Sequence, residues 1–552
     1  MMRFKQNGMI AQTTRFLLIN WPVLFLAVLL SGYLYYSTVV LQGSAPYYRD
    51  YDPEMAYLAN SLMVFKGLPY HYADHPGTPV EIAGTLLLAA SLPFFKNLSD
   101  FVMYYLQNPA TFLNLAHGFV TAVSIACAGY FYISSQRQTR NNRILTGLAL
   151  ALMFYGLHYY AFTTLTLWSH TSFNFPLGSL YLLFLYNLAT RDAAFNRTSL
   201  IWLGLGSGFL VAVMVNFLPW LVGTLIFILV FNRLQKNAWK QVFISCALFL
   251  AASAGGFLVS VLPAIQRMPY FFGFIFKLFD HTLPYGNGPQ GITTLPLLLN
   301  NFWSMYLDSP ILFLSTLAAF CLAIYLLVLQ RDQIALQPGL WGLVIALSVM
   351  LAMEILDVMK HPGNRFLLQQ AATLPVFFLV IWKLCAGHKR LEQILSVGLV
   401  LFSLAAVLYS GNLSLINKQV EINWSRASEV QANAALSDLL NATGIKPGQA
   451  LIMWSNTTYS YCAARLYGNF NTADAFDSEM EQICPNQAQF LFHENWIYYH
   501  GQALPLTSAP WKFLVTLNSM LAGNPAWYKL GSLHVYTDNN SDGIVILESN
   551  NP

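Results

Sequence analysis

The apolar run FLLINWPVLFLAVLLSGYLYYSTVVL, residues 16–41, decides the fold class. It has the length that an α-helix needs to cross a bilayer, about 20 apolar residues. It lacks a clear small-x-small cleavage site, so we interpret it as a retained first span and not as a removable signal. The chain of 552 residues is 56% hydrophobic and only 9% charged, which excludes an ordinary soluble protein. We therefore expect an integral membrane protein.

Working outward from this run, long apolar stretches alternate with short loops rich in Lys and Arg. Placing the basic loops in the cytoplasm predicts eleven crossings, with the N-terminus inside and the C-terminus outside. The stretch 200–231 is too long for one helix, so we expect it to cross twice, with a break near Asn216 and Pro219. The short stretch 85–95 is expected to lie along the outer surface. The expected crossings are about 16–41, 110–136, 144–165, 171–190, two within 200–231, one ending near 263, one from 309 to 331, 339–357, 366–385 and 394–415.

A change of composition near residue 417 predicts a second domain. We expect an α-helical polytopic membrane domain over 1–415, with outer loops 42–109 and 264–309, and a small extracytoplasmic α/β or α+β domain over 416–552. The tail pattern predicts an amphipathic helix at 428–441 and strands near 450–454, 490–492, 533–537 and 544–547. Cys462 and Cys484 are expected to form a disulfide if the tail faces an oxidising compartment.

The first outer loop collects ionisable residues in an otherwise apolar chain. Its sequence YRDYDPEMAY, residues 48–57, places Asp50, Asp52 and Glu54 two residues apart. If a helix begins at Pro53, a favoured first position, Asp52 becomes its N-cap. That structural role accounts for Asp52 alone. The functional alternative is that one carboxylate is a general base at the membrane surface.

Two further outer motifs carry charge. DHPGTP, residues 74–79, holds Asp74 and His75 in a rigid turn, which is either a plain turn with a hydrogen-bonded His or part of a site. KHPGNRF, residues 360–366, puts Lys360 and Arg365 in a very short outer loop, against the usual positive-inside bias. They are either interfacial anchors or ligands for an anion, because a guanidinium matches a phosphate with two parallel hydrogen bonds. The net charge of +4 is small and gives no sign of nucleic-acid binding.

Together these motifs resemble the GT-C superfamily of polytopic glycosyltransferases, especially the branch of protein O-mannosyltransferases and aminoarabinose transferases. In that branch the first outer loop carries an acidic pair, a Tyr and a helix, and continues to a Gly-aromatic segment and a His/Lys-Pro-Pro motif. Here Asp52 and Glu54 precede Tyr57, and GLPYHYADHPGTP follows at 67–79. Pro53 splits the acidic pair and HPG replaces the double proline, so which carboxylate is the base stays open.

Two more positions bear on the resemblance to this family. Arg365 and Phe366 match the Arg-aromatic pair of a late outer loop that approaches the lipid phosphate. Members of the family often have an acidic residue at the outer start of the fourth span. This chain instead has WSHTSFN at 168–174, where His170 is the candidate to replace it.

The resemblance implies an inverting transfer of a sugar from a polyprenyl-phosphate donor to a glycan, lipid or protein acceptor, on the periplasmic side of a bacterial inner membrane. The implied catalytic carboxylates are Asp52, Glu54 and Asp50, and the implied phosphate ligands are Arg365, Lys360 and His75. The candidates for substrate binding are Asp74, Tyr70, Tyr72, His170 and His281. No cofactor is certain. A divalent cation near Asp280 and His281 is left open, since two residues do not make a metal site.

Two rival functions belong to other classes. A lipid-linked glycan flippase or transporter needs charge inside the helical bundle, where Glu354 and Asp357 are the exceptions to an apolar pattern. An O-antigen ligase-type enzyme would share the outer basic residues but would lack the acidic first loop.

Overall fold

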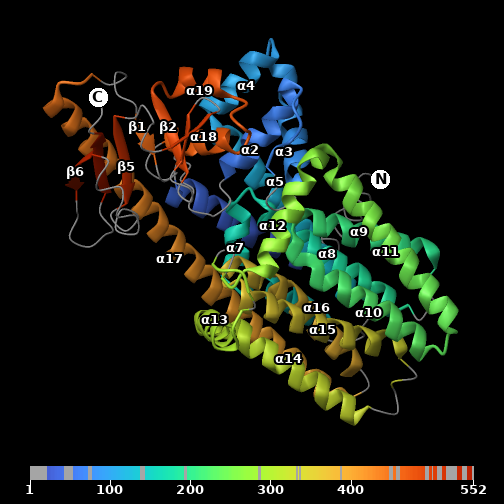
Figure 1. Ribbon diagram of the computed structural model, residues 1–552. Helices are drawn as coiled ribbons and strands as arrows, with labels where there is room; N and C mark the ends of the chain where they lie inside the picture. The colour runs from blue at the N-terminus through green and yellow to red at the C-terminus, as the bar shows by residue number, and fades with distance from the viewer. Residues whose placement is uncertain are drawn as a thin grey trace, which may run out of the picture. The chain divides into compact units, whose positions relative to one another are not determined.

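The structure is a computed structural model of the chain (Figure 1). The residues that it describes are 21–42, 54–72, 77–136, 143–191, 196–283, 288–291, 293–330, 334, 337–385, 388–446, 452–454, 461–491, 496–499, 502–505, 512–517, 531–536 and 544–549.

The chain divides into two compact units. The first comprises Met1–Thr38, Ala73–Pro79 and His117–Ile416, and the second Val39–Tyr72, Val80–Ala116 and Asn417–Pro552. The second unit therefore combines most of the loop 42–109, which the sequence predicted to lie outside, with the C-terminal tail.

The first unit consists of apolar helices. Its elements are Trp21–Gln42, which ends in the π-helical turn η1 (Tyr36–Gln42), most of α5 (Pro109–Gln136), α6 (Arg143–Gly156), α7 (Tyr160–Thr163), η4 (Thr164–Thr166), α8 (His170–Ala189), α9 (Arg197–Val213), η5 (Val215–Phe217), α10 (Leu218–Leu234), α11 (Trp239–Val261), η6 (Leu262–Arg267), α12 (Met268–Asp280), α13 (Leu295–Asp308), α14 (Pro310–Leu329), α15 (Pro338–Lys360), η9 (Asn364–Leu367), α16 (Leu368–Leu384) and the start of α17 (Lys389–Thr443).

In the part of the chain that the structure describes, fewer than eleven helices are candidate membrane spans. Among the described residues, eight helices are long and apolar enough to cross a bilayer, or up to ten if each of two bent pairs is one span. One bent pair, Ile144–Gly156 with Tyr160–Thr166, turns by 83° where the sequence predicted a straight crossing at 144–165. The helix α9, with 17 residues, is too short to pass the same test, and α8 is not among the eight.

The break expected inside the stretch 200–231 is confirmed. Helix α9 ends at Val213, the single 3₁₀ turn η5 follows, and α10 begins at Leu218 with Pro219 in its first turn. Pro is favoured there because the first backbone N–H groups of a helix have no intrahelical acceptor. Two helices therefore replace one long one, and Asn216 lies in the turn between them.

Helices α10 and α15 pack closely because a glycine faces the contact. A Cβ on Gly223 would lie 2.3 Å from Met350 Cγ and 3.1 Å from the carbonyl oxygen of Ala346. Only glycine permits this approach. It brings the start of α10 and the turn before it next to the second half of α15.

The second unit contains a mixed sheet with helices. The helices are α2 (Glu54–Met63), η2 (Val64–Lys66), α3 (Thr78–Ala89), η3 (Leu92–Phe94), α4 (Leu98–Gln107), α18 (Tyr461–Phe470), α19 (Asp477–Ile483) and the end of α17. The strands are β1 (Ile452–Trp454), β2 (Gln487–Leu491), β3 (Trp496–Tyr499), β4 (Gln502–Pro505), β5 (Phe513–Leu517), β6 (Gly531–Tyr536) and β7 (Ile544–Ser549), in the order β4-β3-β2-β1-β5-β7-β6. Strand β1 is parallel to β2 and β5, and the remaining pairs are antiparallel. The expected C-terminal domain with helices and strands is present, with β3, β4 and β5 as additions to the four predicted strands.

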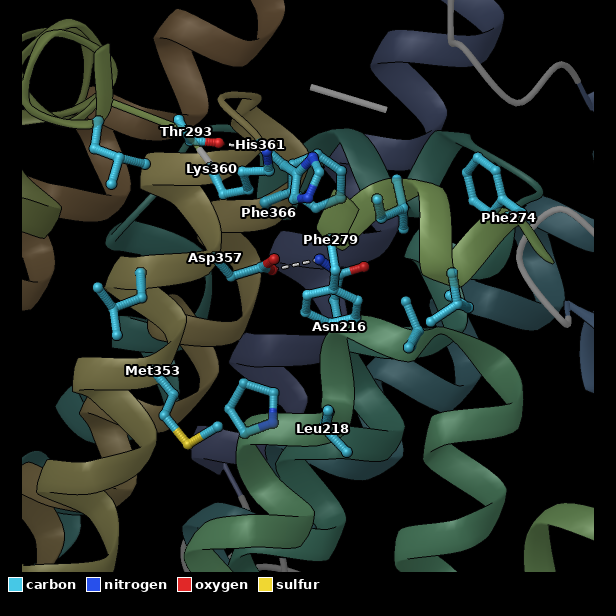
Figure 2. Close-up of a pocket in the computed structure, with 16 residues that line it drawn as sticks. Asn216, Leu218, Phe274, Phe279, Thr293, Met353, Asp357, Lys360, His361 and Phe366 are labelled. Carbon is cyan, nitrogen blue, oxygen red and sulfur yellow. Dashed lines mark hydrogen bonds between the residues drawn. The ribbon is translucent and has the colours of Figure 1, made fainter. Parts of the chain in front are cut away.

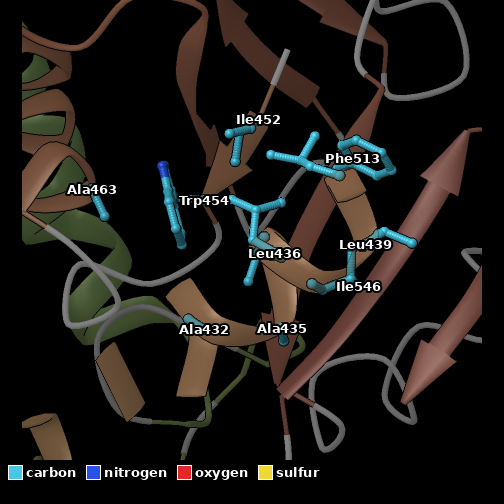
Figure 3. Close-up of a cluster of buried hydrophobic side chains, with 11 residues drawn as sticks. Ala432, Ala435, Leu436, Leu439, Ile452, Trp454, Ala463, Phe513 and Ile546 are labelled. Carbon is cyan, nitrogen blue, oxygen red and sulfur yellow. The ribbon is translucent and has the colours of Figure 1, made fainter. Parts of the chain in front are cut away.

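The core of this sheet includes the end of α17 (Figure 3). Leu436 and Leu439 of the helix pack with Ile452, Trp454 and Phe513 of the strands. The sequence predicted a span at 394–415 and a separate helix at 428–441, but α17 is one helix of 55 residues. No Gly or Pro occurs from residue 412 to residue 443, so the change in composition is not accompanied by a helix breaker.

Candidate functional site

A cavity of about 430 Å³ lies in the first unit, beside α15 (Figure 2). Its walls are mainly apolar. The lining residues are Val215, Asn216, Leu218, Pro219, Phe274, Ile275, Leu278, Phe279, Thr293, Leu298, Met353, Leu356, Asp357, Lys360, His361 and Phe366. The apolar residues come from α10, α12, α13 and α15 and from the turns η5 and η9, so the cavity is shaped for a hydrocarbon group with a few fixed polar contacts.

Lys360 provides the positive charge of the cavity. It is the last residue of α15, and its Nζ donates to Thr293 Oγ1 at 2.5 Å and to the carbonyl oxygen of His281. These bonds attach the segment between α12 and α13 to the end of α15. An ammonium group has three N–H donors, so the two contacts leave one for a ligand.

His361 lies beside Lys360 at the same end of the cavity (Figure 2). Burial lowers the pKa of its imidazole to about 4, and the charge of Lys360 adds to this effect. The imidazole is therefore neutral at neutral pH and offers one hydrogen-bond donor and one acceptor, not a second positive charge.

Asp357 and Asn216 form a second polar level in the cavity. Asn216 Nδ2 donates to Asp357 Oδ2, and Figure 2 shows the pair on opposite sides of the space. About one helical turn deeper on α15, Glu354 is buried and accepts hydrogen bonds from Trp220 Nε1 at 2.5 Å and Thr373 Oγ1 at 2.8 Å. Glu354 does not line the cavity.

Arg365 is placed differently from Lys360, although the sequence grouped the two as phosphate ligands. It lies in η9 and is 5% exposed, with its guanidinium carbon 5.0 Å from the centre of the Phe366 ring. Phe366 lines the cavity, whereas Arg365 does not. Of the two predicted cations, only Lys360 reaches the cavity wall directly.

Glu54 belongs to the second unit. It is the first residue of α2, is 2% exposed, and interacts electrostatically with Lys418 of α17. A carboxylate in the first turn of a helix is also stabilised by the helix dipole. The predicted site residues Asp50, Asp52, Asp74 and His75 lie outside the described residues.

The C-terminal part of the chain supports α2. Asn60 Nδ2 donates to the carbonyl oxygen of Asn471 at 3.1 Å, and a Cβ on Gly468 of α18 would lie 2.8 Å from the carbonyl oxygen of Met55. The disulfide between Cys462 and Cys484 joins α18 to the residue after α19. The helix that begins with Glu54 is thus packed against elements more than 400 residues later in the sequence.

Arg465 of α18 makes a further long-range contact, to the end of α4. Its Nε and one terminal nitrogen donate to the carbonyl oxygens of Leu106 and Gln107, at 2.7 and 2.8 Å. These are among the last carbonyls of α4, which have no intrahelical donor. The arginine therefore caps α4 from the other end of the chain.

Tyr70 and Tyr72, predicted to bind substrate, are buried within the second unit. The hydroxyl of Tyr70 lies 2.9 Å from Thr85 Oγ1, and burial raises its pKa to about 12, with the nearby Glu81 adding to the rise. The backbone N–H of Tyr72 donates to Asn60 Oδ1 at 3.0 Å, and its ring packs edge-on against Tyr57. Tyr72 therefore packs on α2, whereas the hydroxyl of Tyr70 contacts α3.

The two predicted histidines differ in exposure. His170 is the first residue of α8 and is fully buried, whereas His281 is half-buried, with Nδ1 2.8 Å from the carbonyl oxygen of Gly288. Within the described ranges there is no group of three His, Cys, Asp or Glu residues that could hold a metal ion.

Sequence reasoning missed three features of these regions. They are the pairing of Asn216 with Asp357, the pairing of Glu54 with Lys418, and the role of Arg465. A signal existed for the first, because the sequence placed Asn216 at a helix break and Asp357 at a span end. The other two join residues hundreds of positions apart and leave no local pattern.

Among known proteins, the chain is similar to solved structures but to no family model or curated protein. The structure is similar to crystal structures of ArnT from Cupriavidus metallidurans, bound to undecaprenyl phosphate (14% identity, TM-score 0.42, 93% of this chain, 97% of that chain) and in the apo state (12%, 0.38, 93% and 96%). Likenesses this distant assign no activity to this chain.

Proposed function

We propose that this chain is a membrane glycosyltransferase that moves a sugar from a polyprenyl-phosphate donor to a glycan, lipid or protein acceptor on the outer side of the membrane. The observation that carries the proposal is the apolar cavity whose one end holds Lys360 and His361. A polyprenyl phosphate has the matching composition, a long hydrocarbon chain attached to an anion.

The apolar walls would bind the isoprenoid chain. Phe274, Leu278 and Phe279 of α12 present one face to the cavity, opposite Met353 and Leu356 of α15. Burial of each CH₂ group stabilises binding by about 0.8 kcal/mol. A chain of isoprene units therefore gains affinity without specific polar contacts.

Lys360 would hold the phosphate. A charge-assisted hydrogen bond from its remaining N–H, together with the neutral His361, fits an anionic oxygen. Arg365 lies behind Phe366 and adds a second positive charge close to the same end of the cavity. These charges favour departure of the lipid phosphate, since negative charge grows on its oxygen in the transition state.

We assign the general base to Asp52 and a positioning role to Glu54. Glu54 is buried as the first residue of α2 and already interacts with Lys418, so it stabilises the start of that helix. In the reaction, Asp52 accepts the proton of the acceptor hydroxyl and the oxygen bonds to the anomeric carbon. The bond from that carbon to the phosphate oxygen breaks, and the lipid phosphate leaves with the electron pair, which inverts the anomeric centre.

A single-turnover assay tests this function. Purified protein in proteoliposomes is mixed with labelled polyprenyl-phosphate sugars, and the expected product is polyprenyl monophosphate. Asp52→Asn should reduce the rate by about 10²- to 10⁴-fold, the usual contribution of a general base. Full transfer in each of the separate variants Asp52→Asn, Glu54→Gln and Arg365→Ala would contradict the assignment. Release of a lipid diphosphate would favour an O-antigen ligase-type reaction.

One observation favours the transporter alternative. Glu354 is buried among helices of the first unit, as intramembrane charge in a flippase would be. A fluorescent lipid-linked sugar in vesicles distinguishes the two functions. Movement of the sugar to the protected leaflet without an acceptor, and without release of lipid phosphate, would support transport and contradict the transferase.

A further inference from the structure

A carboxylate lies in the wall of the cavity close to its positive end. Along α15, Asp357 and Lys360 both face the space, and Figure 2 shows Asp357 below Lys360. With a rise of about 1.5 Å per residue, their Cα atoms are about 4.5 Å apart along the helix axis. A lipid whose phosphate meets Lys360 therefore has this carboxylate less than one helical turn away, beside the first part of its hydrocarbon chain.

The negative charge of Asp357 is not cancelled by a bonded cation. Lys360 Nζ donates to Thr293 Oγ1 and to the carbonyl oxygen of His281. Asp357 instead accepts from the amide of Asn216, which is neutral. Among the residues that the structure describes, no ion pair includes Asp357. A charged side chain in an apolar wall is costly, so its presence here suggests a function.

The proposed reaction changes the charge of the lipid that the cavity holds. The donor is a phosphodiester and carries one negative charge. The product, polyprenyl phosphate, is a monoester and carries about 1.5 to 2 negative charges at pH 7. A site with only the positive charges of Lys360 and the nearby Arg365 would bind the more negative lipid better. Such an enzyme would retain its product.

We propose that Asp357 repels the more negative product and thereby limits its retention after sugar transfer. This inference rests on the proposed function and adds to it a means of releasing the lipid phosphate. Electrostatic repulsion scales with the product of the two charges, so Asp357 destabilises the bound monoester more than the bound diester. The apolar walls do not offset this difference, because both lipids have the same hydrocarbon chain.

The same repulsion acts on the phosphate while it reacts. Negative charge grows on the leaving oxygen as the bond to the anomeric carbon breaks, so the charge of Asp357 opposes this step. Removing that charge should therefore speed single-turnover transfer and, at the same time, strengthen inhibition by the product. A residue with only a structural role would not change these two quantities in opposite directions.

The test measures binding of two lipids to the full-length protein in nanodiscs, polyprenyl phosphate and its diester with a neutral hexose. Asp357→Asn keeps an oxygen that accepts from Asn216 and removes the charge. It should tighten binding of polyprenyl phosphate, relative to the diester, about tenfold, since like charges several ångströms apart in a protein repel by at least this factor. Added polyprenyl phosphate should also inhibit multiple-turnover transfer at lower concentrations than in wild type.

Two variants separate charge from shape and place. Asp357→Glu keeps the charge and should retain the wild-type ratio of the two affinities. Glu354→Gln makes the same carboxylate-to-amide change one turn away, outside the cavity lining, and should change the ratio less. If wild type binds neither lipid, the proposed function fails. If wild type binds both, but Asp357→Asn leaves the ratio unchanged or is matched by either of the other variants, the role of Asp357 is excluded and the lipid site stands.

Discussion

The cavity of the first unit and the acidic segment of the second unit are built in opposite ways. The cavity is lined by residues between Val215 and Phe366, from helices that follow one another along the chain. Helix α2 and the turn η2 that follows it, in contrast, are held by residues 411 and 413 positions later, through Asn60 to Asn471 and Lys66 to Glu479. The difference teaches that the proposed lipid site and the proposed acid-base segment have separate structural supports. Mutations should therefore separate them.

The largest expected separation comes from removing the disulfide. Replacing Cys462 and Cys484 with Ser should lower the stability of the second unit by about 3 kcal/mol, because a cross-link over a loop of this length reduces the entropy of the unfolded chain. Transfer activity should fall, while polyprenyl phosphate binding to the first unit stays at the wild-type level. Limited proteolysis and nanodisc binding measure the two effects. Cys321→Ser, at an exposed free thiol, is the control. Equal loss of lipid binding would show that the two supports are not separate.

A smaller effect is expected where α18 meets α2. Gly468→Ala places a Cβ 2.8 Å from the carbonyl oxygen of Met55, so one helix must shift, at a cost of about 1–3 kcal/mol. Thermal unfolding and transfer rate should both decrease. Gly398→Ala is the control, because a Cβ there meets nothing within 4 Å and alanine favours the helix. If the two variants behave alike, close packing of α18 on α2 does not matter for activity.

A buried carboxyl group in the loop between α18 and α19 predicts that the stability of the second unit depends on pH. Burial raises the pKa of Asp474 to about 7, and the charge of Asp477 adds to the rise. The folded state then binds this proton more tightly than the unfolded chain, so its stabilising contribution is complete below about pH 4 and is lost as pH rises through about 7. Asp474→Asn should flatten the decline in melting temperature between about pH 5 and about pH 8. An unchanged slope would assign the decline to other groups.

The smallest effect is expected at a partly exposed ion pair. Lys66 Nζ lies 2.9 Å from Glu479 Oε1 and also donates to the carbonyl oxygen of Ala475 at 2.8 Å. With side chains 29% and 17% exposed, a double-mutant cycle of Lys66→Ala and Glu479→Ala should give a coupling below about 1 kcal/mol. The coupling should decrease in high salt. A larger, salt-independent value would mark this contact as a main anchor of the tail.

Much of the first unit could be predicted from the sequence. Apolar length identified most of its helices, and the pair Asn216 and Pro219 marked the break between α9 and α10. Lys360 was also found, because a positive charge in a short outer loop is unusual. Its partners Thr293 and His281 were not predicted, since they depend on how the segment between α12 and α13 folds back.

The second unit was less predictable. Strands β3, β4 and β5 are short, and the sequence pattern did not separate them from the surrounding loops. The contacts of α2 with α18 depend on side chains that meet only in the folded chain, as Gly468 and Met55 do. The continuous α17 could not be predicted from composition, because a change from apolar to mixed composition suggests a helix end, although no residue there stops a helix.

The arginine that caps α4 has a practical consequence for any shortened protein. A chain cut near residue 416 would lose Arg465 together with the sheet, and the final carbonyls of α4 would need new donors from water. Such a fragment would therefore differ from the full-length protein in more than the absence of the C-terminal sheet. It would keep the helices that line the cavity, the proposed lipid site, but would lose the far end of the polypeptide that contacts α2 and caps α4, in the segment that follows the proposed proton acceptor.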